Sequence, residues 1–486
     1  RLVGSEMCIR DSLDNQQHLQ AEDTICALAT PAGGAIGIIR ISGKDAIQIA
    51  DKVFVTSKHK KLYDAKSHTI LYGCIVDSQQ ETIDDVLVSV FRSPHSYTGE
   101  DSVEISCHGS RYIIKTILET LIKEGCRQAA PGEYTQRAFF NGKLDLSQAE
   151  AVADLIASTN RATHHAAMSQ LKGNFSNELA TLRNELLKMT SLIELELDFS
   201  DHEDLEFANR DELLALAHKI KNRITTLAHS FETGNAIKQG VPVAIIGKTN
   251  VGKSTLLNQL LEEDKAIVSN IHGTTRDVIE DTTEINGITF RFIDTAGIRK
   301  TTDEIENLGI ERTYQKIEEA KIVLWLMDEA PTKQEVDDLL KRIKDKSLIC
   351  IQNKMDLLPT PSLSVFENIT NQKSNERNAK KRFSLQLSAK LGTNMDLLRS
   401  TLCQVAEVPE VTENDVIVTS TRHYNALLRS EESISRVIEG LELELSGDLL
   451  SEDLRLCLEH LAEITGGLIT THEVLNNIFQ HFCIGK

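Results

Sequence analysis

The sequence has no uninterrupted apolar run near the roughly 18 residues that a membrane-spanning helix needs. Its nine cysteines include no Cys-x-x-Cys pair, which argues against a disulfide framework and fits a reducing cytosol. The start of the chain has neither a signal-peptide layout nor an Arg-rich, acid-poor presequence. We therefore expect no membrane association and a cytoplasmic location, in a bacterium rather than an organelle.

Basic residues are also scarce. The 486 residues include 53 basic and 72 acidic side chains, a net charge of −19. Residues 141–238 carry 10 basic and 15 acidic side chains and residues 402–486 carry 5 and 15, so these two stretches hold −15 of that charge. Such a chain has no general electrostatic attraction for nucleic acid. RNA could bind only through a local basic patch or a partner protein.

Residues 1–21 look like an extraneous leader. After them, short apolar runs separated by turn signals predict a mixed α+β region. We expect one helix there, Ser110–Glu124. The expected strands are Ala35–Ile41, Ile70–Ile75, Asp85–Phe91 and Ser102–Cys107.

The rest of the chain alternates between helical and α/β textures. Apolar residues recur at helical spacing from Leu144 to Phe231, with a capping box predicted at Ser147, and again after Thr412. Between these parts, strands alternate with helices as in an open α/β sheet, which predicts a globular insert in a helical chain. The expected buried strands are Val243–Ile246, Thr289–Ile293, Ile322–Met327, Leu348–Gln352 and Ser384–Leu387.

A glycine-rich loop, Gly247-Lys-Thr-Asn-Val-Gly-Lys-Ser254, follows one of these strands and precedes a helical pattern. This is the context of a phosphate-binding loop, and it favours that interpretation over a chance Gly-rich turn. Backbone N–H groups and the helix N-terminus would hold the phosphates. Lys253 would reach the β- and γ-phosphates, and Ser254 would ligate Mg²⁺.

Three further motifs follow in order, each at the end of a predicted strand. Asp294-Thr-Ala-Gly297 puts a carboxylate near the metal and a glycine near the γ-phosphate. Asn353-Lys-Met-Asp356 offers a carboxylate that can accept from N1–H and the exocyclic amine of guanine, a pair of donors that adenine lacks. Ser388-Ala-Lys390 would close over the base. Together with the phosphate loop, these motifs predict a GTP-hydrolysing domain.

Ile298 occupies the position where a Ras-like enzyme has the glutamine that orients water. An alkyl side chain cannot orient water, and no arginine finger is evident in the sequence. Asn250 and the loop Gly273-Thr-Thr-Arg-Asp277 are candidates to hold a monovalent cation, which would supply the missing positive charge. Asn250 could equally cap the phosphate loop, and the residues by themselves leave both interpretations open.

Several longer motifs surround this domain: Ile-Gly-Ile-Ile-Arg-Ile-Ser-Gly, Tyr-Thr-Gly-Glu-Asp, Cys-His-Gly, Pro-Gly-Glu-Tyr-Thr-Gln-Arg-Ala-Phe and the closing Phe-Cys-Ile-Gly-Lys. With them, the chain from Asp23 to Lys486 resembles the MnmE (TrmE) family. The resemblance implies a potassium-dependent GTPase that works as a homodimer with the flavoprotein MnmG, in an expected heterotetramer. Together they would add a carboxymethylaminomethyl or aminomethyl group to carbon 5 of the wobble uridine in certain tRNAs.

The resemblance also implies a one-carbon donor, 5,10-methylene-tetrahydrofolate, bound by the N-terminal domain. Its site would be lined by Arg40, Glu104, Lys143 and Lys486. Basic side chains can pair with the carboxylates of the folate tail, and a carboxylate suits the edge of the pterin. Without the resemblance, each of these residues is typical of a solvated surface charge.

In the nucleotide domain, the resemblance assigns catalysis to Glu306, through a second water, together with Lys253 and Asp294. Potassium would join the nucleotide domains of two subunits. The ion ligands would be Asn250, Ser269, Ile271 and Thr274 for K⁺, and Ser254 and Thr275 for Mg²⁺. The residues expected to bind GTP are Asn250, Val251, Gly252, Lys253, Ser254, Thr255, Ser269, Asn270, Ile271, His272, Gly273, Thr274, Thr275, Asp294, Thr295, Ala296, Gly297, Asn353, Lys354, Asp356, Ser388, Ala389 and Lys390.

The resulting fold class is a multidomain α/β and α+β protein, in which a Ras-like P-loop GTPase domain is inserted into a helical domain. The predicted parts are a leader (1–21), an N-terminal α+β folate-binding and dimerisation domain (22–140), a first helical part (141–239), the GTPase domain (240–406) and a second helical part (407–486).

Two other functions were weighed against this one. A ribosome-assembly switch GTPase has similar nucleotide motifs, but such proteins usually append a basic RNA-binding module, and the helices predicted here are acidic. A stand-alone folate-dependent aminomethyl transferase would have a vestigial nucleotide site, which the complete set of motifs argues against.

Overall fold

The computed structural model describes residues 23–56, 61–198, 209–261, 281–293, 317–343, 346–357, 382–409 and 411–467, with Leu475, Ile478, Phe479, Phe482 and Gly485. The chain divides into two compact units. The first comprises Arg1–Ile156, Gln170–Asn184 and Leu458–Lys486, and the second comprises Ala157–Ser169 and Glu185–Cys457. None of the described helices combines the length and apolar character that crossing a membrane requires.

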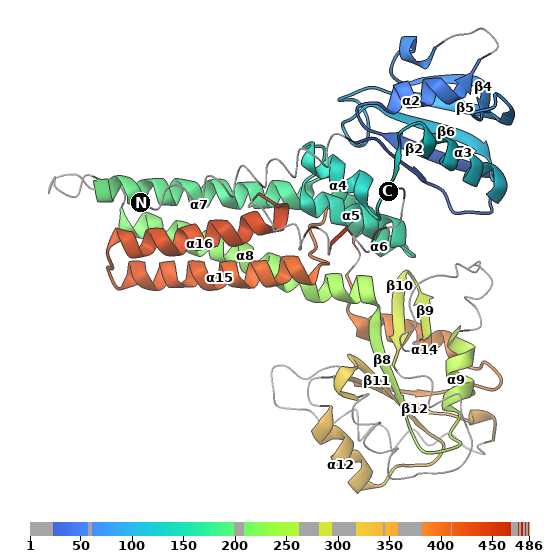
Figure 1. Ribbon diagram of the computed structural model, residues 1–486. Helices are drawn as coiled ribbons and strands as arrows, with labels where there is room; N and C mark the ends of the chain where they lie inside the picture. The colour runs from blue at the N-terminus through green and yellow to red at the C-terminus, as the bar shows by residue number, and fades with distance from the viewer. Residues whose placement is uncertain are drawn as a thin grey trace, which may run out of the picture. The chain divides into compact units, whose positions relative to one another are not determined.

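The first unit contains a seven-stranded sheet in the order β3-β4-β5-β6-β2-β1-β7 (Figure 1). Its elements are β1 (Ile25–Leu28), β2 (Ile36–Ser42), α2 (Ala46–Val53), β3 (Phe54–Val55), β4 (Thr69–Val76), β5 (Thr82–Phe91), β6 (Ser102–His108), α3 (Arg111–Lys123) and β7 (Arg127–Gln128). Side chains alternate along each strand, so residues such as Ile39, Val88 and Ile105 share one face. Helices α2 and α3 pack on that face and complete the core.

The predicted strands and the helix at 110–124 are confirmed here with small shifts of boundary. The expectation of a single helix is wrong, because α2 and α4 (Glu133–Phe140) are also present. Each of these helices has only eight residues. Two turns are too few for the helical period to stand out from neighbouring β-rich runs.

Helix α5 (Leu146–Ala157) begins earlier than its predicted cap. Asp145 Oδ1 accepts from the backbone N–H of Gln148 at 2.9 Å, and Gln148 Oε1 accepts from the N–H of Asp145 at 3.0 Å. This reciprocal pair is the capping box, so the prediction of one at Ser147 is wrong. Burial of Leu146 against Leu475 and Phe479 explains the earlier start, since that residue must already lie on the helix.

The helical part of the second unit brings together helices that are far apart in the sequence. Its helices include α8 (Arg210–Gln239) and α15 (Thr421–Glu442), with parts of α6 (Arg161–Leu171), α7 (Asn174–Asp198) and α16 (Gly447–Thr465). The rings of Phe231 on α8 and Tyr424 on α15 stack with centroids 4.4 Å apart. Because α8 precedes the α/β region and α15 follows it, that region is an insert in a helical region, as predicted.

The insert is a six-stranded sheet in the order β13-β12-β11-β8-β10-β9. Its elements are β8 (Val241–Ile246), α9 (Lys253–Leu261), β9 (Asp281–Ile285), β10 (Ile288–Phe292), β11 (Ile322–Met327), α12 (Lys333–Arg342), β12 (Ser347–Gln352), β13 (Arg382–Gln386) and α14 (Met395–Ala406). All five predicted strands are confirmed, and the additional strand is the antiparallel edge strand β9. Helices α9 and α14 join one core and α12 the other, so both faces are covered, as a parallel sheet requires.

Candidate functional sites

The phosphate loop joins β8 to α9, as its motif predicts. Its glycines are required by close approaches of backbone and side chains. A Cβ on Gly247 would lie 2.4 Å from Leu326 O, and one on Gly252 would lie 2.3 Å from Asn353 Nδ2. Asn250 has a left-handed φ of +62°, a conformation that asparagine adopts more readily than most residues. The loop thus takes a defined shape from its own residues and from the ends of neighbouring strands.

Lys253 is the first residue of α9 and bends back over the loop. Its ammonium donates to the carbonyls of Gly247 and Lys248, at 2.7 Å each. A phosphate is a stronger partner than these carbonyls, because both members of the bond are then charged. Ser254 and Thr255 follow in the first turn, where a helix presents backbone N–H groups suited to an anion.

Asn353, which is only 3% exposed, organises the end of the site that is predicted to recognise the base. Its Nδ2 donates to Val251 O at 2.8 Å, and its Oδ1 accepts from Ala389 N at 2.9 Å. One buried amide therefore ties the phosphate loop to the Ser388–Lys390 segment. Three of the predicted motifs meet at this side chain, one of them 102 residues and another 36 residues away along the chain.

Asp356 accepts a hydrogen bond of 2.6 Å from Ser388 Oγ. That bond lowers the pKa of the exposed Asp356 carboxyl, so the group is ionised at neutral pH. An ionised carboxylate is the acceptor that the two donors of guanine need. Beside it, Lys354 has a left-handed φ of +60° and pairs with Asp328 at 2.8 Å.

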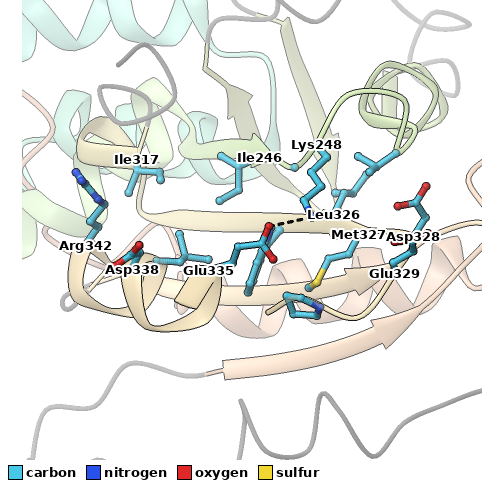
Figure 2. Close-up of a pocket in the computed structure, with 15 residues that line it drawn as sticks. Ile246, Lys248, Ile317, Leu326, Met327, Asp328, Glu329, Glu335, Asp338 and Arg342 are labelled. Atoms are coloured by element: carbon cyan, nitrogen blue, oxygen red, sulfur yellow. Dashed lines mark ion pairs between the residues drawn. The ribbon is translucent and has the colours of Figure 1, made fainter. Parts of the chain in front are cut away.

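A cavity of about 360 Å³ lies between the phosphate loop, β11 and α12 (Figure 2). Lys248 and Glu335 form an ion pair of 2.8 Å at its edge. The hydrogen bond from Lys248, and then that from the backbone of Thr332, lower the pKa of Glu335 to about 2. The Lys248 side chain is 69% exposed, so the pair contributes little to stability.

Part of the predicted nucleotide site lies outside the described residues. This applies to the potassium and magnesium ligands Ser269, Ile271, Thr274 and Thr275, the intervening Asn270, His272 and Gly273, the motif Asp294, Thr295, Ala296 and Gly297, the residue Ile298 and the catalytic Glu306. In the first unit it applies to Lys486.

A second site lies on the sheet of the first unit, on the face opposite α2 and α3. Arg40 on β2 stands directly opposite Glu104 on β6. Arg40 Nη2 lies 2.8 Å from Glu104 Oε1, and Nε donates to the same oxygen at 2.9 Å. The guanidinium lies 5.6 Å from the ring centroids of both Tyr97 and Tyr134. The two predicted residues thus form one cationic–acidic site with aromatic walls.

The remaining predicted residues join this site to different degrees. Lys143 does not contact the Arg40–Glu104 pair; its Nζ donates to Pro94 O at 2.9 Å, at the start of the loop that carries Tyr97. The C-terminal segment does reach the pair, because Arg40 Nη1 donates to Gly485 O at 3.4 Å.

The first unit also contains a buried charge network that the sequence did not predict. Arg137, only 7% exposed, pairs with Asp23, Glu100 and Glu133. Burial alone would raise the pKa values of Asp23 and Glu133, but hydrogen bonds from Arg127 and Arg137 lower both. Only the four-residue spacing of Glu133 and Arg137 on α4 could have signalled part of it.

Replacing Arg137 by Ala is expected to lower the free energy of unfolding of the first unit by about 3–5 kcal/mol, because buried carboxylates lose their partner. Hydrogen–deuterium exchange of β1 and β2 in the full chain would measure the loss. Arg127→Ala is a matched control, since Arg127 pairs with two of the same carboxylates but is 46% exposed. Its cost should be about 1 kcal/mol or less. Equal losses in both variants would contradict the prediction.

The mostly parallel, doubly covered sheet, the phosphate loop after its first strand and the contacts of the predicted guanine motif at Asn353–Asp356 define this protein as a P-loop GTPase. A family model described as the MnmE helical domain matches residues 146–483, and one described as the GTP-binding protein TrmE N-terminus matches residues 24–143. The chain belongs to the MnmE family.

Curated relatives agree with this assignment along nearly the whole chain. The tRNA modification GTPase MnmE of Bacteroides fragilis is 57% identical and that of Phocaeicola vulgatus 54% identical, each over 96% of this chain and 100% and 99% of the relative. That of Porphyromonas gingivalis is 47% identical over 96% of this chain and 99% of the relative.

Proposed function

We propose that this chain is a potassium-dependent GTPase that modifies wobble uridine in certain tRNAs. With the flavoprotein MnmG, it would add a carboxymethylaminomethyl or aminomethyl group to carbon 5 of the base, in a bacterial cytoplasm. GTP hydrolysis would supply a conformational drive, since no atom of GTP enters the product. The GTPase part of this proposal rests on the contacts of Asn353, which joins the phosphate loop to the predicted base-recognition segment.

The proposed one-carbon donor is 5,10-methylene-tetrahydrofolate, which supplies the carbon when bound. The residues present suit such a ligand. Glu104, held by Arg40 at 2.8 Å, can accept from the donors of the pterin edge, while Tyr97 and Tyr134 offer aromatic surfaces. Lys143, and Lys486 beyond the described residues, would add positive charge for the folate tail.

We further propose a homodimer, within a larger assembly with MnmG, and the domain boundaries predicted above. Three exposed apolar side chains on the face of the N-terminal sheet opposite α2 and α3 support self-association. Ile70 and Tyr72 are each 65% exposed and Leu87 is 48% exposed, with Tyr72 directly opposite Leu87. An exposed apolar patch on a sheet is typical of an interface.

Potassium is expected to raise the rate of GTP hydrolysis by about tenfold or more over sodium at equal ionic strength, because the ion would supply charge that a Ras-like enzyme takes from an arginine. Phosphate release measured in the two salts tests this. Asn250→Ala should leave the two rates nearly equal by removing one ligand. Equal rates in the unmodified protein would refute the role of potassium.

Deleting the gene is expected to remove the carbon-5 side chain from wobble uridine in tRNA. Mass spectrometry of tRNA nucleoside digests is the measurement, and re-expression of the unmodified chain is the control. An unchanged digest would overturn the tRNA-modification proposal and favour a ribosome-assembly role.

A further inference from the structure

Within the first unit, the C-terminal segment contacts the N-terminal part at two glycines whose conformations other residues rarely adopt. Gly132, at φ +67°, lies against this segment: a Cβ there would be 2.7 Å from Phe479 O. Gly485 belongs to the segment itself and has a φ of +91°. The end of the chain is thus docked on the N-terminal part by close backbone approaches.

Gly485 is buried where strand β1 ends. A Cβ at this position would lie 2.2 Å from Leu28 O, 2.9 Å from Leu28 C and 3.0 Å from Ala29 Cα. These neighbours are backbone atoms of a paired strand, so they cannot turn aside as a flexible side chain could. The positive φ and the short distances independently demand a residue without a side chain.

This approach brings the carbonyl of Gly485 to the Arg40–Glu104 site. Strands β1 and β2 pair with Leu28 opposite Ile39, so the end of β1 lies next to Arg40. Arg40 Nη1 donates to Gly485 O at 3.4 Å, while Nε and Nη2 face Glu104. The guanidinium is therefore held on one side by a carboxylate and on the other by the end of the chain.

We propose that Gly485 is a positioning residue for the Arg40–Glu104 site: its lack of a side chain lets its carbonyl hold the Arg40 guanidinium in place. Any larger residue would push the carbonyl away and leave Arg40 fewer restraints. A ligand bound at the Arg40–Glu104 pair would then meet a less preorganised site and bind more weakly. This inference rests on the proposed binding of a reduced folate at the site.

Calorimetric titration of the full-length protein with tetrahydrofolate, under anaerobic conditions, tests the inference. Gly485→Ala should weaken binding by about tenfold, as expected for a lost hydrogen bond to a charged group. Gly33→Ala is the matched control, because its φ is +96° but an added Cβ meets no atom within 4 Å. It should keep the affinity within about twofold. Unchanged hydrogen–deuterium exchange of β1 and β2 in every variant would show that the first unit remains folded.

A double-mutant cycle separates positioning of Arg40 from a general structural effect. Arg40→Lys keeps the charge but removes the second donor that faces Gly485. In that background, Gly485→Ala should cause no further loss of tetrahydrofolate affinity. The same tenfold loss in both backgrounds, or no loss in the single variant, would overturn the inference alone. Failure of the unmodified protein to bind tetrahydrofolate would instead overturn the proposed folate site on which it rests.

Discussion

Asp356→Asn is expected to weaken GTP binding by about 100-fold or more and to create affinity for xanthosine triphosphate. The carboxylate of Asp356 can accept from both N1–H and the exocyclic amine of guanine, and each lost bond to a charged group is worth about 1.5–3 kcal/mol. An amide keeps one acceptor but turns a donor toward the guanine amine. Xanthine has a carbonyl at that position, which accepts from the amide. The hydrogen bond from Ser388 can persist, because the amide oxygen also accepts.

Equilibrium titration with GTP and xanthosine triphosphate measures both changes. Asp396→Asn is a suitable control, since this aspartate stands at the start of α14 with a fully exposed side chain (100%) and pairs only locally with Arg399. It should bind GTP like the unmodified protein. An Asp356→Asn variant that retained full affinity for GTP would show that this carboxylate does not read the base.

Lys253→Ala is expected to reduce GTP hydrolysis by about 1,000-fold, since the ammonium that meets the β- and γ-phosphates stabilises charge that develops in the transition state. Single-turnover hydrolysis at saturating GTP separates this loss from weaker binding. If hydrolysis drives the modification, a deletion strain that expresses the variant should also lack the wobble-uridine side chain in tRNA digests.

A second lysine in the same loop provides the control. The backbone carbonyl of Lys248 accepts a hydrogen bond from Lys253. The side chain of Lys248 instead pairs with Glu335 at the exposed edge of the cavity. Lys248→Ala should change hydrolysis by no more than about threefold, because an exposed pair is worth less than about 1 kcal/mol. Equal losses in the two variants would mean that loop integrity, rather than the Lys253 charge, had been measured.

Much of the nucleotide site could be predicted because its motifs are contiguous and each follows a buried strand. Parallel strands end at the same edge of a sheet, so residues after β8, β12 and β13 must come close together. The contacts of Asn353 with Val251 and Ala389 meet that expectation.

Local sequence patterns were less reliable for predicting where a helix begins. The capping box was predicted at Ser147, but the structure forms it between Asp145 and Gln148. Burial of Leu146 by residues more than 300 positions away selects this earlier start. Helix α2 escaped prediction because its eight residues give only two turns of helical pattern among β-rich runs.

By itself, the sequence determined that the chain has a guanine-nucleotide site and that this site lies in an insert, while the proposed folate residues came from the family resemblance. Only the tertiary structure decided how the charged residues are used. It set Arg40 opposite Glu104, brought Gly485 to the same guanidinium across 445 residues of chain, and buried Arg137 among three carboxylates. A motif specifies contacts among residues that are close in the sequence. These contacts instead join distant segments, which meet only when strands pair and the end of the chain docks.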